Sequence, residues 1–494
     1  MPGRSRVGQL AHRFVLLTAV GCHSISPPQS QVSQVNQFVH DRAGVTFDAR
    51  PLLAASLPQP QPPTGFLTLG DATERALRRN LALVAAAENL TIAHGQLVQA
   101  GLIQNPTLGQ TSGWLFPISP AHGFPSIDAN ITEVVNSIFT QPARVSVARL
   151  QEVQANIDLA TQAFTLAQQV DTKYQELIHL LRARSLAQRI TELYARAVRA
   201  AEARQKVGII PTPELNRARL SYEDARRQVQ HLTTQYGRAA REMNWLMGYS
   251  TAPKWRLPDD VVQEVGDISS LPGADNLEPL ALRYRLDLLR ADFDRRVGAH
   301  TLELARIGLF PQLTPGFEIA RDGSKNVVGG PFFSIVLPIF DPGLVAVQLA
   351  QAQVRKADKT YTALAGQVQQ DVRTAYDNWR IAADDLEFFQ QRLIPQQEEN
   401  VRLMETSFRL GNDDLDSLLN VYQSYVQQLQ AFEDAIQAYH DSAVALQQAV
   451  GLAWKRILAE GHAPAKTRPS VTPPATLPAL TLPVTAPAAT EQKP

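Results

Sequence analysis

The side chains that could perform chemistry are scattered along this chain of 494 residues. Five of its ten histidines fall on predicted helices, each of them alone rather than in a cluster: His94, His179, His231, His300 and His440. The sequence lacks the His-Glu-x-x-His pattern, the Gly-x-Ser-x-Gly turn, the Walker loop and the Gly-x-Gly-x-x-Gly turn. We therefore predict that the protein is not an enzyme and has no catalytic residue, no metal ligand and no cofactor.

Charge and composition narrow the class of protein further. Lys and Arg number 47, as do Asp and Glu, and this zero net charge argues against a nucleic-acid partner, which would need clustered cations. A hydrophobic fraction of 44% excludes a wholly disordered chain, and only 7% aromatic residues favours long helices over an all-β core. No apolar run reaches the roughly 18 residues that a spanning helix needs, so a membrane crossing would have to use strands.

The single cysteine, Cys22, follows a predicted export signal. Arginines precede a short apolar stretch, Phe14–Val20, and Ala19-Val20-Gly21-Cys22 resembles a bacterial lipobox, in which the cysteine becomes acylated. A lone cysteine also excludes an intramolecular disulfide and a cysteine zinc cluster. We predict that Cys22 is lipidated, since several acyl chains anchor a protein firmly in a membrane. The alternatives are an ordinary signal peptide or a buried free thiol.

Proline-rich segments flank the central part of the chain. Residues 23–63 contain seven prolines and no sustained apolar period, which predicts an extended leader. Residues 463–494 are rich in Ala, Thr and Pro and cannot bury enough surface to offset their ordering entropy, so we expect a disordered tail.

The central part contains a duplication. Five short matches recur in the same order at offsets of 200 to 207 residues: Ala76-Leu77-Arg78 with Ala281-Leu282-Arg283, Gly101-Leu102-Ile103 with Gly308-Leu309-Phe310, Pro142 with Pro342, Val207-Gly208 with Leu410-Gly411, and Met247-Gly248 with Val450-Gly451. Such regularity indicates two copies of a unit of roughly 190 residues. The predicted divisions are 1–21 signal peptide, 22–65 lipidated extended segment, 66–250 first repeat, 251–276 linker, 277–455 second repeat and 456–494 disordered tail.

Breaker residues divide each unit into helices. Residues 143–207 contain neither Gly nor Pro and would span roughly 98 Å as a helix. Apolar residues recur there every seven positions, which predicts helices packed as in coiled coils: Leu150, Ile157, Phe164, Leu186, Leu193, Ala200 and Val207. The second long helix is expected at 343–410, where Gly366 and Pro395 should interrupt and bend it. Shorter helices are predicted near 68–100, 214–247, 277–307 and 412–450.

Each unit also has a predicted strand pair ahead of its long helix. The strands lie near 107–117 and 128–140 in the first unit, and near 312–321 and 331–340 in the second. Four strands cannot close a barrel, and open sheet edges are not tolerated in hydrocarbon. Three copies would supply twelve strands and a ring of helical columns. The rival interpretation is a soluble periplasmic coiled-coil adaptor or scaffold, in which the strand pairs would be loops.

About residues 66–455 resemble the TolC-type outer membrane factor family, most of all its lipoprotein branch of heavy-metal and multidrug efflux channels. The resemblance rests on Leu69-Gly70-Asp71-Ala72 with Ala76-Leu77 and Asn80, on Gly101-Leu102-Ile103-Gln104-Asn105-Pro106-Thr107-Leu108-Gly109, on Gly330–Asp341, and on Phe408-Arg409-Leu410-Gly411. It implies a fold that is mainly α with a β-barrel part: two tandem repeats whose long antiparallel helices form a trimeric α-barrel, and four strands per protomer in a 12-stranded transmembrane barrel.

The same resemblance implies a function. The protein would be the passive outer-membrane exit duct of a tripartite efflux pump, lipid-anchored, with a helical tunnel in the periplasm. Its partners would be two further copies of itself, a periplasmic adaptor (membrane fusion) protein, an inner-membrane RND-type transporter and outer-membrane lipid. The alternative is the outer-membrane component of a protein or polysaccharide secretion system.

Candidate functional residues lie at the two helical turns far from the barrel. By resemblance, Val207-Gly208-Ile209 and Arg409-Leu410-Gly411 flank the grooves where adaptor hairpins dock, although glycine also permits a left-handed turn for purely structural reasons. Family members carry entrance aspartates where this chain has Ser417 and Asn420. Asp413, Asp414 and Asp416 lie just before these positions and, tripled by symmetry, would form an anionic ring at the periplasmic entrance. The alternative is a solvated turn in which Asp413 or Asp414 caps the next helix.

Overall fold

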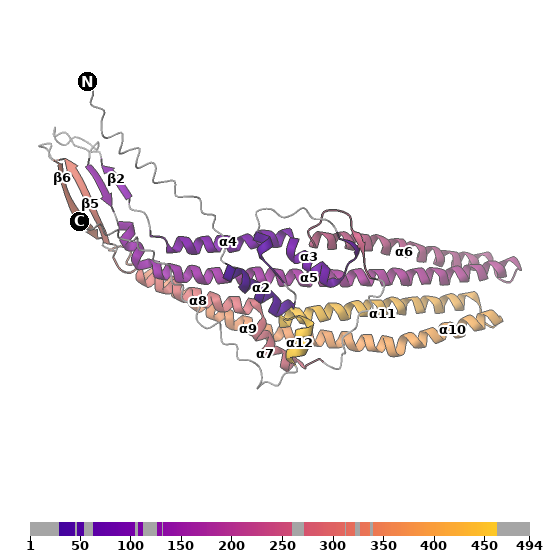
Figure 1. Ribbon diagram of the computed structural model, residues 1–494. Helices are drawn as coiled ribbons and strands as arrows, with labels where there is room; N and C mark the ends of the chain where they lie inside the picture. Colours follow the sequence, from indigo (N-terminus) through magenta and orange to yellow (C-terminus); the bar gives the residue numbers. More distant parts are fainter. Residues whose placement is uncertain are drawn as a thin grey trace, which may run out of the picture.

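A computed structural model shows an elongated molecule with a small sheet at one end and long helices running to the other (Figure 1). It describes residues 29–44, 47–53, 63–103, 107–111, 126–130, 132–258, 271–311, 313–321, 327–335 and 339–461. Cys22 and the predicted signal peptide lie outside these ranges, as does the proline-rich tail after residue 461.

The elements of the first half are helices α3 (Leu69–Arg79) and α4 (Leu81–Gly101), strands β2 (Thr107–Thr111) and β3 (Ser126–Asn130), and helices α5 (Thr132–Lys206) and α6 (Thr212–Leu246). The second half has helices α7 (Ala274–Tyr284) and α8 (Leu286–Ile307), strands β5 (Leu313–Arg321) and β6 (Val327–Ile335), helix α9 (Leu344–Phe388), a π-helical turn η3 (Phe389–Leu393), and helices α10 (Ile394–Leu410) and α11 (Leu415–Val450). The order of elements is therefore the same in both halves.

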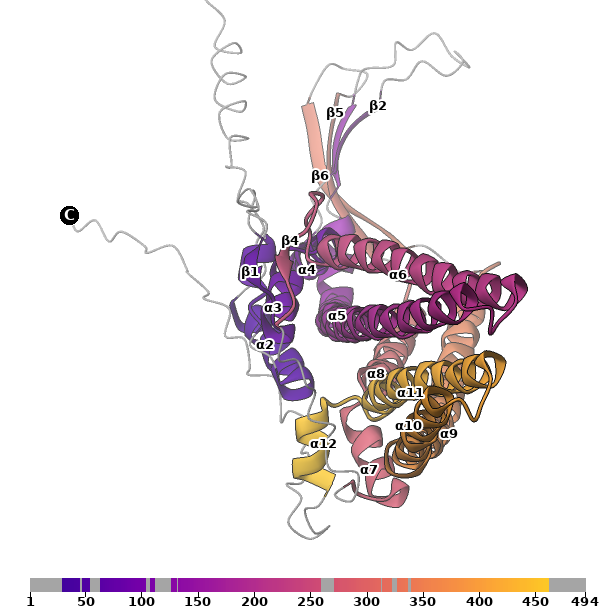
Figure 2. The ribbon, with the colours of Figure 1, turned by 90° about the vertical axis from the view of Figure 1, so that its right-hand side faces the viewer.

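Shorter elements gather around the middle of the molecule, which we call the waist. They are α2 (Gln29–Ala43), the 3-10 turn η1 (Arg50–Leu53), α12 (Trp454–Gly461), and a parallel pair of strands, β1 (Thr64–Phe66) and β4 (Lys254–Arg256). Seen along the long axis, α2, α3, α7 and α12 lie on one side of the long helices (Figure 2).

The two ends of the described chain meet at the waist. The backbone N–H of Ala453 donates to the carbonyl of Arg42 at 2.6 Å, and Arg42 Nε donates to the carbonyl of Tyr284 at 2.7 Å. Burial of its guanidinium lowers the pKa of Arg42 to about 10, so Arg42 remains charged at neutral pH. The N-terminal helix is thus fixed to both the second half and the C-terminal helix.

The four long strands form one antiparallel sheet in the order β2-β3-β5-β6, so the two halves join through the pairing of β3 with β5. Only one neighbour is described for β2 and for β6, which are the edge strands. Leu313 pairs with Ile335 and Pro315 with Phe333, which places these four apolar residues on one face. That face is open to solvent: Phe333 is 76% exposed.

Buried apolar residues form three separate clusters. The first is built from α2 to α6 with part of α8, and the second from α7, α9, α11 and α12. The third lies near the far ends of the long helices, which we call the tip, and joins α5 and α6 to α10 and α11. Among the described residues, the two halves therefore share the tip core and, through Leu286 and Phe293 of α8, the first core, whereas the second core comes from the second half alone.

Each opening helix is broken at the waist, which the sequence analysis did not anticipate. Asn80 ends α3 and caps α4, because its Oδ1 accepts from the N–H groups of Ala82 and Leu83 while its Nδ2 donates to the carbonyl of Leu246 at 2.9 Å. In the second half the break falls at Arg285, between α7 and α8.

Several predicted boundaries were wrong. Residues 128–140 were expected to form a strand, but α5 begins at Thr132 and continues through Pro142. The β-branched residues of this stretch favour a strand only weakly, and the rest of the fold overrides that preference. The fourth strand is 327–335 rather than 331–340, and α9 runs without a break through Gly366. The interruption is the π-helical turn just before Pro395, whose missing N–H removes a helical hydrogen bond.

The terminal segments also differ from their predictions. Residues 29–43 are helical rather than extended, because Val32, Val35 and Val39 recur at helical spacing and are buried in the first core. Helix α12 extends to Gly461, so residues 456–461 are ordered structure rather than disordered tail.

By length and composition, α4 is the one helix of the described ranges that could cross a membrane. In this fold, however, its Leu83, Ala87 and Leu90 are buried in the first core.

Candidate functional site

The tip carries the two turns predicted to be functional. Gly208 follows α5 with φ of 76°, and Gly411 follows α10 with φ of 83°, so the predicted left-handed glycines are confirmed. The N–H of Ile209 donates to the carbonyl of Arg204, and that of Asn412 to the carbonyl of Ser407, which closes each helix end. Nothing lies within 4 Å of the position that a Cβ would take on either glycine.

Large apolar side chains project from both turns into solvent. Val207, Ile209 and Leu410 are 70%, 67% and 71% exposed. Val207 continues the seven-residue spacing of α5 but does not pack like Leu186 and Leu193, because the helix ends at Lys206. Both turns therefore present apolar side chains to solvent at the tip.

The tip is held together by a core that both halves build. Phe408 and Leu415, on either side of the second turn, are buried against Ala201 and Leu215 of the first half. The guanidinium of Arg204 lies over the ring of Phe408, 3.7 Å from its centroid, and donates to the Phe408 carbonyl. The hydroxyl of Tyr422 also donates to Glu405 at 2.7 Å, which ties α11 to α10.

The acidic residues after the second turn play different parts in this structure. Asp414 is the N-cap of α11: its Oδ1 accepts from the N–H of Ser417 at 2.7 Å, and hydrogen bonds from Ser417 hold the pKa of the Asp414 carboxyl below its ordinary value. The capping role considered for Asp413 or Asp414 therefore belongs to Asp414. Asp413 precedes the helix and is partly exposed.

Arg217 of α6 connects the two halves at the tip. Its Nη1 lies 3.0 Å from Oδ1 of Asp416, and its Nη2 donates to Oδ1 of Asn420 at 3.3 Å. Two of the five predicted entrance residues thus share one cation from the first half. The sequence analysis missed Arg217, although an offset of 203 residues relates it to Asn420, and this correspondence is the signal that could have identified it.

The described ranges contain no group of three or more His, Cys, Asp or Glu side chains placed to bind a metal ion. Of the five histidines expected to lie singly on helices, His231 is exposed on α6, while His179 and His440 are partly buried where α5 faces α11.

Comparison with known proteins finds one matching family model and two relatives of similar length. Residues 277–452 match the family described as outer membrane efflux protein. The chain is 25% identical over 395 residues to the cobalt-zinc-cadmium resistance protein CzcC of Cupriavidus metallidurans. This alignment covers 77% of this chain and 90% of that protein. It is also 25% identical over 345 residues to the pyoverdine export outer membrane protein OpmQ of Pseudomonas putida. That alignment covers 67% of this chain and 71% of OpmQ.

The fold matches solved structures over most of the chain. A crystal structure of CusC, a protein described as undergoing transmembrane channel formation, aligns with a TM-score of 0.64 at 17% identity, and the alignment covers 81% of this chain and 96% of that one. The predicted resemblance and the mainly helical fold are thereby confirmed. The names of these relatives describe resistance, export and channel formation rather than an enzymatic reaction.

Proposed function

We propose that this chain, which resembles the TolC-type outer membrane factor family and matches the outer membrane efflux protein family over residues 277–452, is the passive exit duct of a tripartite efflux pump. Three copies would form one conduit from periplasm to exterior, together with a periplasmic adaptor and an inner-membrane RND-type transporter. The names of CzcC and OpmQ refer to chemically different substances, metal ions and pyoverdine. The proposal therefore assigns the choice of cargo to the transporter.

The observation that carries this proposal is the open sheet at one end of the helical column. An antiparallel sheet of four strands has two edges whose backbone groups need partners. If β6 of one copy pairs with β2 of the next, three copies close twelve strands and leave no edge, as hydrocarbon requires. The exposed face of Leu313, Phe333 and Ile335 would then contact lipid.

The predicted domain division belongs to the same proposal. The matched order of elements supports two repeats, at 66–250 and 277–455, although the boundary residues themselves are our inference. A cleaved signal peptide at 1–21 and acylation of Cys22 would deliver and anchor the protein. Helix α2, packed at the waist, would then connect that anchor to the tunnel wall.

At the tip the proposal assigns docking to the two turns and gating to the acidic residues. Val207, Ile209 and Leu410 offer apolar contacts to an adaptor beside the glycine turns. Asp413, with Asp414, Asp416, Ser417 and Asn420 behind it, would line the entrance of the trimer and attract cations. Arg217 would hold this segment against α6 while the duct is idle.

The test of the whole proposal is assembly and conduction. We expect the purified protein to run as a trimer that dissociates on heating, to fractionate with the outer membrane, and to conduct ions in planar lipid bilayers. A monomer that is soluble without detergent and does not conduct would overturn the proposal in favour of a periplasmic scaffold.

A charge on the exposed sheet face should block assembly. Phe333→Arg would place a cation in lipid, at a cost of about 2–4 kcal/mol near the bilayer midplane. We expect the yield of outer-membrane trimer, measured by fractionation and native electrophoresis, to fall at least tenfold. Leu220→Arg is the matched control, since Leu220 is 68% exposed but lies on α6. Equal trimer yields for the two variants would show that this face does not contact lipid.

A charge on the second turn should weaken adaptor binding without unfolding the tip. Leu410 is 71% exposed, so Leu410→Glu removes no core contact. Burial of a leucine in an interface is worth about 1.5–3 kcal/mol, so affinity for the adaptor that co-purifies with the wild-type protein should drop tenfold or more. The drop in affinity would be measured as binding of the adaptor to surface-immobilised trimer. Leu403→Glu, on the exposed side of α10, is the control, and a similar loss there would refute a specific role for the turn.

A further inference from the structure

The interface between α5 and α11 differs from the three apolar cores in being polar at its centre. The two helices pack together, yet at this level α5 belongs to the first apolar core and α11 to the second. One stripe of α5 runs from Gln168 and Gln175 through His179 and Arg182 before becoming apolar at Leu186. The facing stripe of α11 has Glu433, Gln437 and His440. We call this interface the seam.

Buried polar atoms without a hydrogen-bond partner in the described part of the chain concentrate in the seam. On α5 they are Gln168 Nε2, Gln175 Oε1 and His179 Nδ1, and on α11 they are Glu433 Oε2, Gln437 Oε1 and His440 Nε2. Buried polar groups are nearly always paired, and a group left unpaired costs about 1–3 kcal/mol. A run of six along one interface therefore indicates groups that are satisfied by solvent or by a second arrangement of the two helices.

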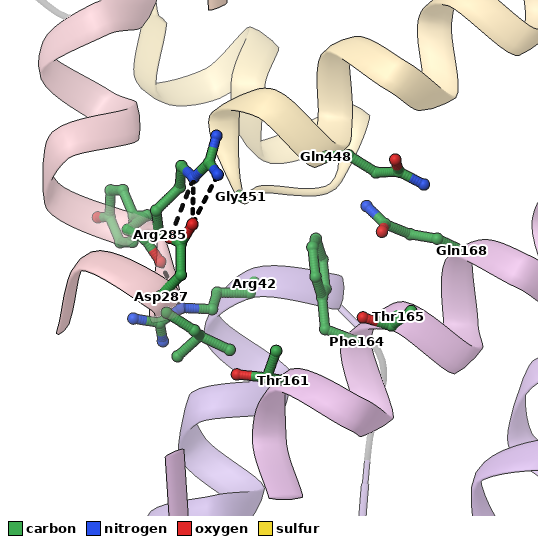
Figure 3. A pocket seen from close by; sticks show the side chains of 11 residues that line it. Arg42, Thr161, Phe164, Thr165, Gln168, Arg285, Asp287, Gln448 and Gly451 are labelled. Atoms are coloured by element: carbon green, nitrogen blue, oxygen red, sulfur yellow. Dashed lines mark hydrogen bonds and ion pairs between the residues drawn. The ribbon is translucent and has the colours of Figure 1, made fainter. Parts of the chain in front are cut away.

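Two cavities lie along the seam. One of about 240 Å³ is lined by His179 and Glu433 together with Gln228 and Gln430, toward the tip. The other, of about 250 Å³ at the waist, is lined by Gln168 and Gln448, whose amides point toward one another across the space (Figure 3). A cavity of this size holds water molecules where polar groups line it, as His179, Glu433 and the glutamine amides do here. Water can exchange hydrogen bonds as helices shift, whereas an interlocked apolar core resists such sliding.

We propose that the seam is a hydrated joint sensitive to acid, in which protonation of His440 favours separation of α11 from α5. Its link to opening of the tip rests on the proposed duct function, because α11 carries the entrance residues and α5 and α6 form the fixed wall. Separation of the helices does not rest on that function and is a property of the chain itself.

The charges around His440 set the sign of the effect. Burial, and next the cation of Arg182 on α5, lower the pKa of His440 to about 4, so the joined seam holds a neutral imidazole. Where the helices separate, His440 meets water and regains an ordinary pKa near 6.5. The separated state then binds the proton more tightly, and falling pH favours it between about pH 6.5 and 4.

Glu433 acts in the opposite direction. Burial raises the pKa of its carboxyl, although His179, Arg182 and Arg189 on α5 oppose the shift, and Asp434 beside it adds to the shift. A raised pKa means that the joined seam prefers the protonated acid, so acid stabilises the joined state through this group. His440 alone would raise the ratio of separated to joined helices about tenfold between pH 7.5 and pH 5.5, and Glu433 reduces this rise.

The test measures the distance between nitroxide labels on the two helices in the full-length protein in detergent. Ser185→Cys on α5 and Ala438→Cys on α11 provide exposed sites beside the seam. Labelled chains are diluted with unlabelled ones, so that only distances within a chain are recorded. Protein without engineered cysteines gives the background from Cys22. We expect a longer-distance population that grows severalfold, up to about tenfold, relative to the short one from pH 7.5 to 5.5.

Three variants decide the interpretation. His440→Gln should abolish the acid-driven separation and leave only the smaller opposite response of Glu433, Glu433→Gln should enlarge the separation, and His231→Gln, at an exposed position on α6, should leave it unchanged. Wild-type distances that do not change with pH, or an acid-driven separation that survives in His440→Gln, would overturn the proposal. Because this measurement needs no conduction, it remains decisive even if the protein conducts no ions.

Discussion

Gly248→Ala is expected to prevent stable folding of the waist. Gly248 has φ of 81°, and a Cβ at this position would lie 2.4 Å from the carbonyl oxygen of Arg79 and 2.9 Å from its carbonyl carbon. Left-handed strain costs about 1–2 kcal/mol, and displacing backbone adds about 1–3 kcal/mol more. Arg79 precedes Asn80, whose side chain bonds to Leu246, so the displacement would disturb both chain segments. Thermal unfolding followed by circular dichroism, together with trimer yield, measures the loss.

Two other glycines make this prediction specific. Gly208 has a similar φ of 76° but nothing within 4 Å of its Cβ position, so Gly208→Ala should cost only the backbone strain. Gly451 is intermediate, since its Cβ would meet Arg285 atoms at 3.2 to 3.3 Å. The expected order of destabilisation is Gly248, then Gly451, then Gly208. Equal losses at all three would mean that strain alone, and not contact at the waist, decides the outcome.

The sequence was informative where the required structure is local. A left-handed turn needs glycine whatever surrounds it, so Gly208 and Gly411 could be located directly. Long helices follow from an absence of breakers, and α5 indeed covers all but the last residue of 143–207. The buried positions of Ile157, Leu186 and Leu193 follow from their seven-residue spacing.

The sequence was less informative where the outcome depends on contacts from distant segments. Asn80 breaks a helical stretch because Leu246, 166 residues away, supplies an acceptor for its amide. Helix α2 is too short and too polar to be stable as an isolated helix. It forms because α5 covers its valines. The polar seam follows the same heptad spacing as an apolar one, so its character becomes visible only when His179 and Glu433 are found to line one cavity.

Arg217→Glu is expected to shift the tip toward its open state. Arg217 is the cation that Asp416 and Asn420 share across the two halves, and a glutamate there would replace attraction with repulsion. One exposed ion pair contributes only about 0.2–1 kcal/mol. Three identical pairs in a trimer act on the same opening, so their sum reaches roughly 0.6–3 kcal/mol, and charge reversal adds to it. We expect at least a tenfold rise in the open fraction of single channels in planar bilayers.

Arg219 provides a closely matched control for the contact of Arg217 with Asp416 and Asn420. Arg219, two residues further along α6, pairs with Glu202 at 2.8 Å and is about as exposed as Arg217, but Glu202 belongs to α5 of the same half. Arg219→Glu should therefore leave the open fraction unchanged, because α5 and α6 do not separate in the proposed motion. The double variant Arg217→Glu with Asp416→Arg restores the pair with its charges exchanged and should close the channel again. If Arg219→Glu opens the channel equally, or the exchanged pair fails to close it, the tip is held by its apolar core rather than by Arg217.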